Sequence, residues 1–129
     1  MTEPTILVVD DIADIVDEMV QMLDLVDLSA VGAGSVGAAI EQIGAHPGIR
    51  VVVSDLRLSG ESGTEIPTRV DSDPALTRRN LSFLFMTGDT DQARAMARRP
   101  NSTVLSKPID PRTLITTITE LVESTSGRS

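Results

Sequence analysis

The residues most suggestive of chemistry are five polar side chains at the ends of four short apolar runs. They are Asp10 and Asp11 after the first run, and Asp55, Thr87 and Lys107 after three later ones. Two neighbouring carboxylates repel each other and lose hydration at a cost, so the pair at 10–11 needs a positive partner. Clustered carboxylates without softer ligands suit Mg²⁺. Asp55 is placed to attack phosphorus and form an acyl phosphate, with Lys107 neutralising oxygens and Thr87 donating a hydrogen bond.

Taken alone, each of these residues has a simpler explanation. A pair such as Asp10 and Asp11 is more typical of a helix N-cap and first turn than of a metal site. Asp55 alone is typical of a turn, Thr87 of a loop hydroxyl and Lys107 of the surface. The elements that hold these side chains decide between the two interpretations.

Short, largely apolar runs predict five strands buried on both faces. These runs cover residues 5–10, 29–34, 50–55, 81–88 and 102–108. Between the first two, apolar residues at three- and four-residue spacing predict a helix that carries Ile12, Ile15, Val16, Met19, Leu23 and Val26 on one face.

Helices are also predicted between the later strands. Ser35 is a suitable N-cap for the second helix, and the third begins near Thr64. A short helix is expected over 90–99, and Asp110 with Pro111 indicates the start of the last helix.

The alternation of strands and helices predicts an α/β fold, a doubly wound (βα)₅ flavodoxin-like domain with a parallel five-stranded sheet of order 2-1-3-4-5. In such sheets ligands bind beyond the carboxyl ends of the strands. The five polar residues should therefore converge there, which their simpler explanations do not require. The domain is expected over 1–123, with a flexible tail or cut linker at 124–129.

Composition excludes several classes of function. The chain has 129 residues, no cysteine, a single histidine and a formal net charge of -8. Disulfides, thiolate nucleophiles and Cys- or His-rich metal sites are excluded, and the acidic balance argues against direct nucleic-acid binding. The sequence shows neither a membrane-spanning run of about 20 apolar residues nor a signal-peptide pattern, so a cytoplasmic location is expected.

The combined pattern resembles the receiver domain of two-component response regulators over essentially the whole chain. The matching motifs are "ILVVDD", "VVVSDLRLSGESG", "FLFMTGD" and "LSKPID". The resemblance implies that a histidine kinase or phosphotransfer protein phosphorylates Asp55, with Thr87 as switch hydroxyl and Lys107 as phosphate-binding lysine. It further implies a cis bond from Lys107 to Pro108.

The resemblance also implies the cofactor. Mg²⁺ would be bound by Asp11, Asp55 and the backbone carbonyl of Arg57, with Asp10 acting through water. The chain would then not be an enzyme, but a signalling domain that catalyses its own phosphorylation and dephosphorylation.

Phosphorylation is expected to draw Thr87 inward and to switch a surface for a downstream protein or a phosphorylation-dependent homodimer. That surface comprises residues 90–99, Val104 and exposed positions of 111–122. We expect a stand-alone protein. The alternatives are a receiver excised from a multidomain regulator or hybrid kinase, and a non-phosphorylated receiver-like interaction module.

Two departures from the family matter. Val104 stands where many members carry the aromatic residue of the switch. Arg57 and Asp89 occupy variable positions beside the phosphoacceptor, and we expect them to form an ion pair across the mouth of the site. The pair should contribute no more than about 1 kcal/mol and should hinder water.

Other phosphate-handling folds fit less well. Haloacid-dehalogenase-type phosphatases need an acid two residues after a first-strand nucleophile, where this chain has Ile12 or Ala13. A flavodoxin-like cofactor module would place no carboxylate pair against an anionic ligand. The P-loop pattern GxxxxGK is missing from the sequence.

Overall fold

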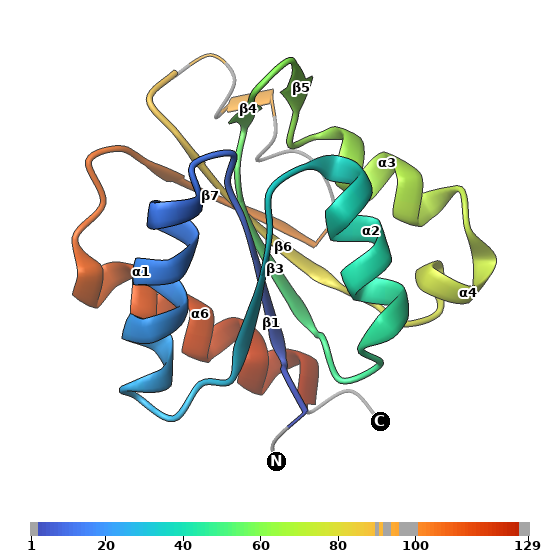
Figure 1. The fold of residues 1–129 in the computed structure, drawn as a ribbon, viewed down its shortest axis with the longest axis horizontal. Helices are drawn as coiled ribbons and strands as arrows, with labels where there is room; N and C mark the ends of the chain where they lie inside the picture. Colours follow the sequence, from blue (N-terminus) through green and yellow to red (C-terminus); the bar gives the residue numbers. More distant parts are fainter. Residues whose placement is uncertain (1–2, 90, 92–93, 96–100, 127–129) are drawn as a thin grey trace.

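A computed structural model describes residues 3–89, 91, 94–95 and 101–126, and its centre is a five-stranded parallel sheet. The strands are β1 (Ile6–Val9), β2 (Ala30–Ala33), β3 (Val51–Asp55), β6 (Ser82–Thr87) and β7 (Ser102–Ser106), in the order β2-β1-β3-β6-β7 (Figure 1). Because β6 and β7 are the fourth and fifth strands of this sheet, the order confirms the predicted flavodoxin-like 2-1-3-4-5 arrangement.

Helices cover both faces of the sheet, as the doubly wound prediction requires (Figure 1). On one face lie α1 (Ala13–Asp24) and α6 (Pro111–Ser126). On the other lie α2 (Val36–Ala45), α3 (Glu65–Asp71) and the short α4 (Pro74–Thr77). Each face has its own apolar cluster, so both faces of the strands are buried. None of the described helices combines the length and apolar character needed to cross a bilayer.

The strand register brings the polar ends of the strands to one edge. Val9 pairs with Ala33 on β2 and with Ser54 on β3, so Asp10 leaves the sheet next to Asp55. Farther along the sheet, Thr87 pairs with Ser106, the residue before the lysine. The predicted convergence at the carboxyl edge follows from this register.

The loop after β3 contains a structure that the sequence did not predict. It forms a small antiparallel hairpin of β4 (Arg57–Leu58) and β5 (Glu61–Ser62), joined by Ser59 and Gly60. Gly60 has φ +70°, a conformation that glycine adopts without steric cost. Leu58 is buried in the apolar cluster of the α2 face, which fixes the hairpin to the core.

Two predicted segments need comment. The helix expected over 90–99 lies mostly outside the described residues, although residues 91, 94 and 95 are helical. Of the residues expected to form a tail at 124–129, residues 124–126 belong to the last turn of α6. Residues 127–129 lie outside the described part of the chain.

Candidate functional site

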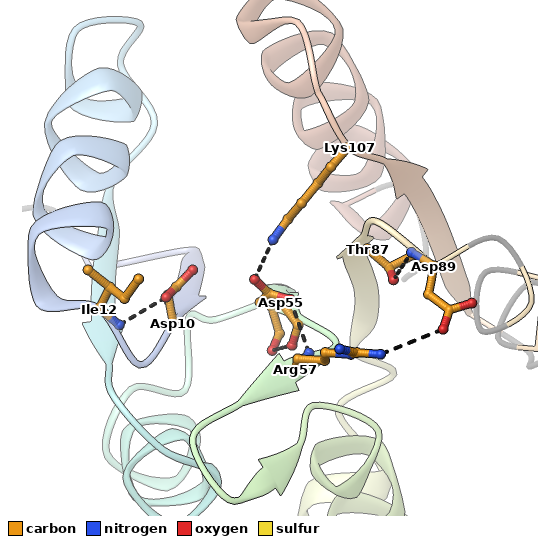
Figure 2. Close-up of polar contacts among 8 residues, drawn as sticks. Asp10, Ile12, Asp55, Arg57, Thr87, Asp89 and Lys107 are labelled. Atoms are coloured by element: carbon orange, nitrogen blue, oxygen red, sulfur yellow. Dashed lines mark hydrogen bonds and ion pairs between the residues drawn. The ribbon is translucent and has the colours of Figure 1, made fainter.

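Asp55 is the last residue of β3, and both of its carboxylate oxygens accept hydrogen bonds. Lys107 Nζ donates to Oδ2 at 2.5 Å, and the backbone N–H of Arg57 donates to Oδ1 at 3.0 Å (Figure 2). The lysine side chain is 46% exposed and that of Asp55 14%. The carboxylate is thus oriented, and its charge is balanced inside the protein.

The chain turns tightly beneath Asp55, and a glycine makes this turn feasible. The backbone N–H of Gly63 donates to Leu56 O at 2.8 Å. A Cβ at Gly63 would lie 2.3 Å from the backbone oxygen of Asp55 and 2.9 Å from Ser54 Oγ. Any larger side chain would therefore displace the strand end that carries Asp55.

Thr87 and Lys107 share a cleft of about 640 Å³ with Asp55. Thr87 is buried, and its Oγ1 accepts a hydrogen bond from the backbone N–H of Asp89 at 2.9 Å. The backbone N–H of Lys107 donates to the carbonyl of Thr87 at 2.8 Å, which fixes the two strand ends to each other. The bond from Lys107 to Pro108 is cis, as predicted.

The predicted ion pair across the mouth of this cleft is present. Arg57 Nη2 lies 3.7 Å from Asp89 Oδ2, and Figure 2 shows the arginine side chain extending from below Asp55 to the far loop. The arginine side chain is 78% exposed and the aspartate 37%. An ion pair this exposed is expected to be weak, and its contribution of no more than about 1 kcal/mol stays a prediction.

The charges of Asp10 and Asp11 are not balanced by a lysine or arginine as the charge of Asp55 is. Asp10 is buried, and its Oδ1 accepts from the backbone N–H of Ile12 at 2.9 Å (Figure 2). Burial raises the pKa of Asp10, the hydrogen bond from Ile12 lowers it, and the charges of Asp55 and Asp11 raise it further. Within the described residues, neither Asp10 nor Asp11 forms an ion pair with a basic side chain. Asp10 thus uses one oxygen locally, but the N-cap of α1 is Ile12 and no side chain caps the helix, so the helix-cap explanation of the aspartate pair is wrong.

The site residues are divided between two hollows. Asp10 and Asp11 line a second one of about 520 Å³ between α1 and β2. In the described part of the chain, no three acidic or histidine side chains form a ready-made metal cage. Mg²⁺ needs no such cage, because it binds one or two carboxylates and keeps several waters. Oxygen ligands, and a buried carboxylate whose pKa two neighbouring negative charges raise, fit this ion.

Sequence reasoning missed three residues of the site. Asp91 lines the cleft, and its backbone N–H donates to Asp89 Oδ1 at 2.9 Å. Gly63 permits the tight turn under Asp55. Glu61 joins the hairpin to α2, since its Oε1 accepts from the backbone N–H of Val36 at 3.1 Å. Only the close spacing of Asp91 to Asp89 was visible in the sequence.

The switch region is described in part. Val104 is half-buried and packs against the apolar cluster of the α2 face. It thus lies at the edge of the core, on the strand paired with β6, which ends in Thr87.

Comparison with known proteins supports this reading of the fold. Three similar structures are a sensor protein from Polaromonas sp. JS666, a response regulator receiver domain protein from Clostridium thermocellum and a CheY-like response regulator receiver domain protein from Methanospirillum hungatei. Their sequence identities to the chain are 22%, 22% and 21%, and their TM-scores 0.80, 0.78 and 0.78. The alignments cover 96%, 95% and 99% of this chain and 99%, 97% and 100% of theirs.

Identities this low establish the fold alone. No curated protein sequence matches the chain significantly. The family model of the response regulator receiver domain, however, matches residues 6–119, almost the whole described domain. The chain therefore belongs to the response regulator receiver domains of two-component signalling.

Proposed function

We propose that this domain takes a phosphoryl group from a phosphohistidine onto Asp55. The observation that carries the proposal is the environment of the Asp55 carboxylate, which lies in a cleft with the ammonium of Lys107 on one oxygen and the hydroxyl of Thr87 nearby. A carboxylate nucleophile, a cation and a hydroxyl donor are the groups that phosphoryl transfer to an aspartate needs.

The transfer is a substitution at phosphorus. An oxygen of Asp55 forms a bond to phosphorus while the bond from phosphorus to the donor's imidazole nitrogen breaks, and that electron pair returns to the ring. Lys107 neutralises the phosphoryl oxygens, and Thr87 turns its hydroxyl toward one of them. Water later attacks phosphorus, the bond from phosphorus to the Asp55 oxygen breaks, and inorganic phosphate leaves the regenerated carboxylate. Because the domain modifies and restores its own side chain, we class it as a signalling domain and not as an enzyme.

The carboxylates on the other side of Asp55 are proposed to hold the metal. Asp11, Asp55 and the backbone carbonyl of Arg57 would bind Mg²⁺ directly, with Asp10 acting through water. The ion would neutralise and orient the phosphoryl oxygens. In its absence, Lys107 serves as the counter-ion of Asp55.

The surface beside the site fits a protein donor. Ile12, the N-cap residue of α1, and Ile15 in its first turn are 52% and 38% exposed, and exposed apolar side chains grouped in this way are typical of a protein-contact surface. An apolar hollow of about 580 Å³, lined by Met19 and Pro108, lies next to Lys107. The sequence has no lysine or arginine before Arg50, so the α1 surface is acidic. The proposed donor is a histidine kinase or phosphotransfer protein whose contact helix carries apolar and basic side chains.

The output is proposed to be a protein contact. Phosphorylation would move Thr87 and the loop after it, and with them the surface of β7 and α6 that contacts a downstream protein or a second copy. Val104 cannot report this change as an aromatic switch residue would. Direct nucleic-acid binding is not expected. The cytoplasmic location and the stand-alone state stay predictions.

Intact-mass measurement tests this function, because the chain has no Trp or Tyr to report binding by fluorescence. The protein is incubated with Mg²⁺ and a small acyl-phosphate donor, beside Asp55→Asn and a sample with chelator. One added phosphoryl group that is missing from both controls supports the proposal. A folded protein that gains none, even with candidate kinases, contradicts it and favours the non-phosphorylated interaction module.

A further inference from the structure

We propose that Glu61 is a positioning residue that holds Arg57 across the mouth of the Asp55 cleft by anchoring the β4–β5 hairpin to the N-terminus of α2. The inference rests on the proposed phosphorylation of Asp55. It assigns to Glu61, which does not line the cleft, control over how long the phosphoryl group survives.

The pairing of the hairpin places its four residues on two faces. Leu58 pairs with Glu61 and Arg57 with Ser62, and side chains of cross-strand partners share a face of the ladder. On the inner face, Leu58 is buried in the same apolar cluster as Val36. The Glu61 carboxylate accepts from the backbone N–H of Val36, the first residue of α2. A carboxylate at this position also interacts favourably with the helix dipole.

The outer face of the hairpin points to the site. The backbone N–H of Arg57 donates to Asp55 Oδ1, and its guanidinium pairs with Asp89 on the opposite loop (Figure 2). The side chain of Arg57 therefore connects the two loops that border the cleft. Asp55, Arg57 and Asp89 line the same cleft, so water that reaches Asp55 through it passes this side chain.

The hairpin needs an external anchor. Each strand has two residues, and an isolated two-stranded hairpin is at best marginally stable in water. An exposed ion pair is weak because both side chains must be ordered to form it. Arg57 can thus stay at the mouth only while the backbone beneath it is fixed. Leu58 fixes β4 in the apolar cluster. On β5, Glu65 makes a local contact with Ser62, three residues away, whereas Glu61 connects the strand to α2.

The α2 side of this contact is itself well ordered. Ser35 caps α2 with its own side chain, which accepts from the backbone N–H of Ala38 at 3.1 Å. The two acceptors therefore serve different N–H groups, and Glu61 is not needed to start the helix. Its removal should loosen the hairpin and leave α2 in place.

The test is the rate at which the phosphorylated chain loses its phosphoryl group, followed by intact mass after the donor is removed. Arg57→Ala should lose it faster, by about fivefold or less, the limit that a weak ion pair sets. Glu61→Ala should show most of this acceleration. Glu61→Gln retains the acceptor oxygen and should stay close to the unsubstituted chain.

Two controls separate positioning from general loosening. Glu65→Ala removes a similar carboxylate, which accepts from Ser62 N at 3.1 Å but does not reach α2, and should have little effect. In the double variant with Arg57→Ala, Glu61→Ala should add nothing, because it acts through Arg57. Independent, multiplying effects of the two substitutions would overturn the inference.

The remaining outcomes are also distinguishable. If the unsubstituted chain takes up no phosphoryl group, the proposed function fails, and this inference with it. If it does, but Glu61→Ala loses the group no faster than Glu65→Ala, only the role of Glu61 fails. Unchanged loss in Arg57→Ala would likewise overturn the inference while leaving phosphorylation intact.

Discussion

The site has two sides that balance charge in opposite ways. On the basic side, formed by the ends of β3, β6 and β7, Lys107 pairs with Asp55 and Arg57 with Asp89. On the acidic side, at the end of β1, Asp10 and Asp11 form no ion pair with a described basic side chain. Both sides belong to the same edge of one sheet, so the difference comes from side chains and not from the fold.

This difference indicates how each side works. A cation brought to the acidic side relieves repulsion that is already present, so its binding should stabilise the fold. A phosphoryl group on the basic side must instead replace the Asp55 carboxylate as the partner of Lys107. The lysine then exchanges one anionic partner for another. Ligand binding should therefore change stability mainly through the acidic side, and changes on the basic side should appear mainly in rates.

The largest effect is expected for Lys107→Met on the basic side. Removal of one group that neutralises developing charge commonly slows a reaction by about 100-fold or more, and we expect phosphorylation by a small donor to slow about that much. The rate of adduct formation measures it, with Arg69→Met as a control for the loss of one positive charge elsewhere. An unchanged rate would show that the lysine serves only as a counter-ion of Asp55.

The next effect concerns Mg²⁺ on the acidic side. An ion that binds only the folded chain stabilises it by about 1.4 kcal/mol at ten times its dissociation constant. Thermal unfolding with Mg²⁺ and with chelator should show this gain, and Asp11→Asn should remove most of it. Equal stabilisation of Asp11→Asn would place the ion elsewhere.

Asp10→Asn should stabilise the metal-free protein at neutral pH. Because the pKa of Asp10 is raised in the folded state, the folded chain holds this proton to a higher pH than the unfolded chain. Stability is then lost as pH rises through the unfolded and folded pKa values, so at pH 7 the charged carboxylate destabilises the folded chain.

Asparagine removes this charge and retains the acceptor for Ile12 N–H. Urea unfolding at pH 7 and near pH 3.5 measures the effect. The gain should be clear at the higher pH and small at the lower. A variant less stable than the unsubstituted chain at pH 7 would mean that the hydrogen bond outweighs the burial of charge.

Much of the fold was predictable because apolar runs and helical periodicity are local signals. These signals predicted the five parallel strands, which the structure contains. They also predicted Ser35 as the N-cap of α2, and its side chain accepts from the backbone N–H of Ala38. The strand-end rule then assembled Asp55, Thr87 and Lys107 from distant parts of the sequence. The ion pair of Arg57 with Asp89 was expected from the resemblance, which places both residues beside the phosphoacceptor.

The missed features depend on contacts between elements. The β4–β5 hairpin has too few residues for a period to show, and its turn contains only one glycine. Glu61 acts on an N–H group 25 positions earlier in the chain, which no spacing rule connects. The need for glycine at 63 arises from the backbone of Asp55, which only the folded chain brings near.

The smallest effect should be the stability that the Arg57–Asp89 pair contributes. We expect a double-mutant cycle of Arg57→Ala and Asp89→Ala to give a coupling of about 0.5 kcal/mol or less, because the arginine side chain is 78% exposed. Salt at about 1 M, where screening acts over roughly 3 Å, should remove most of it. Urea unfolding of the four proteins at low and high salt measures the coupling. A salt-resistant coupling above about 1 kcal/mol would show that the pair is shielded from solvent, and the basic side would then balance its charges by buried contacts that a phosphoryl group could not readily exchange.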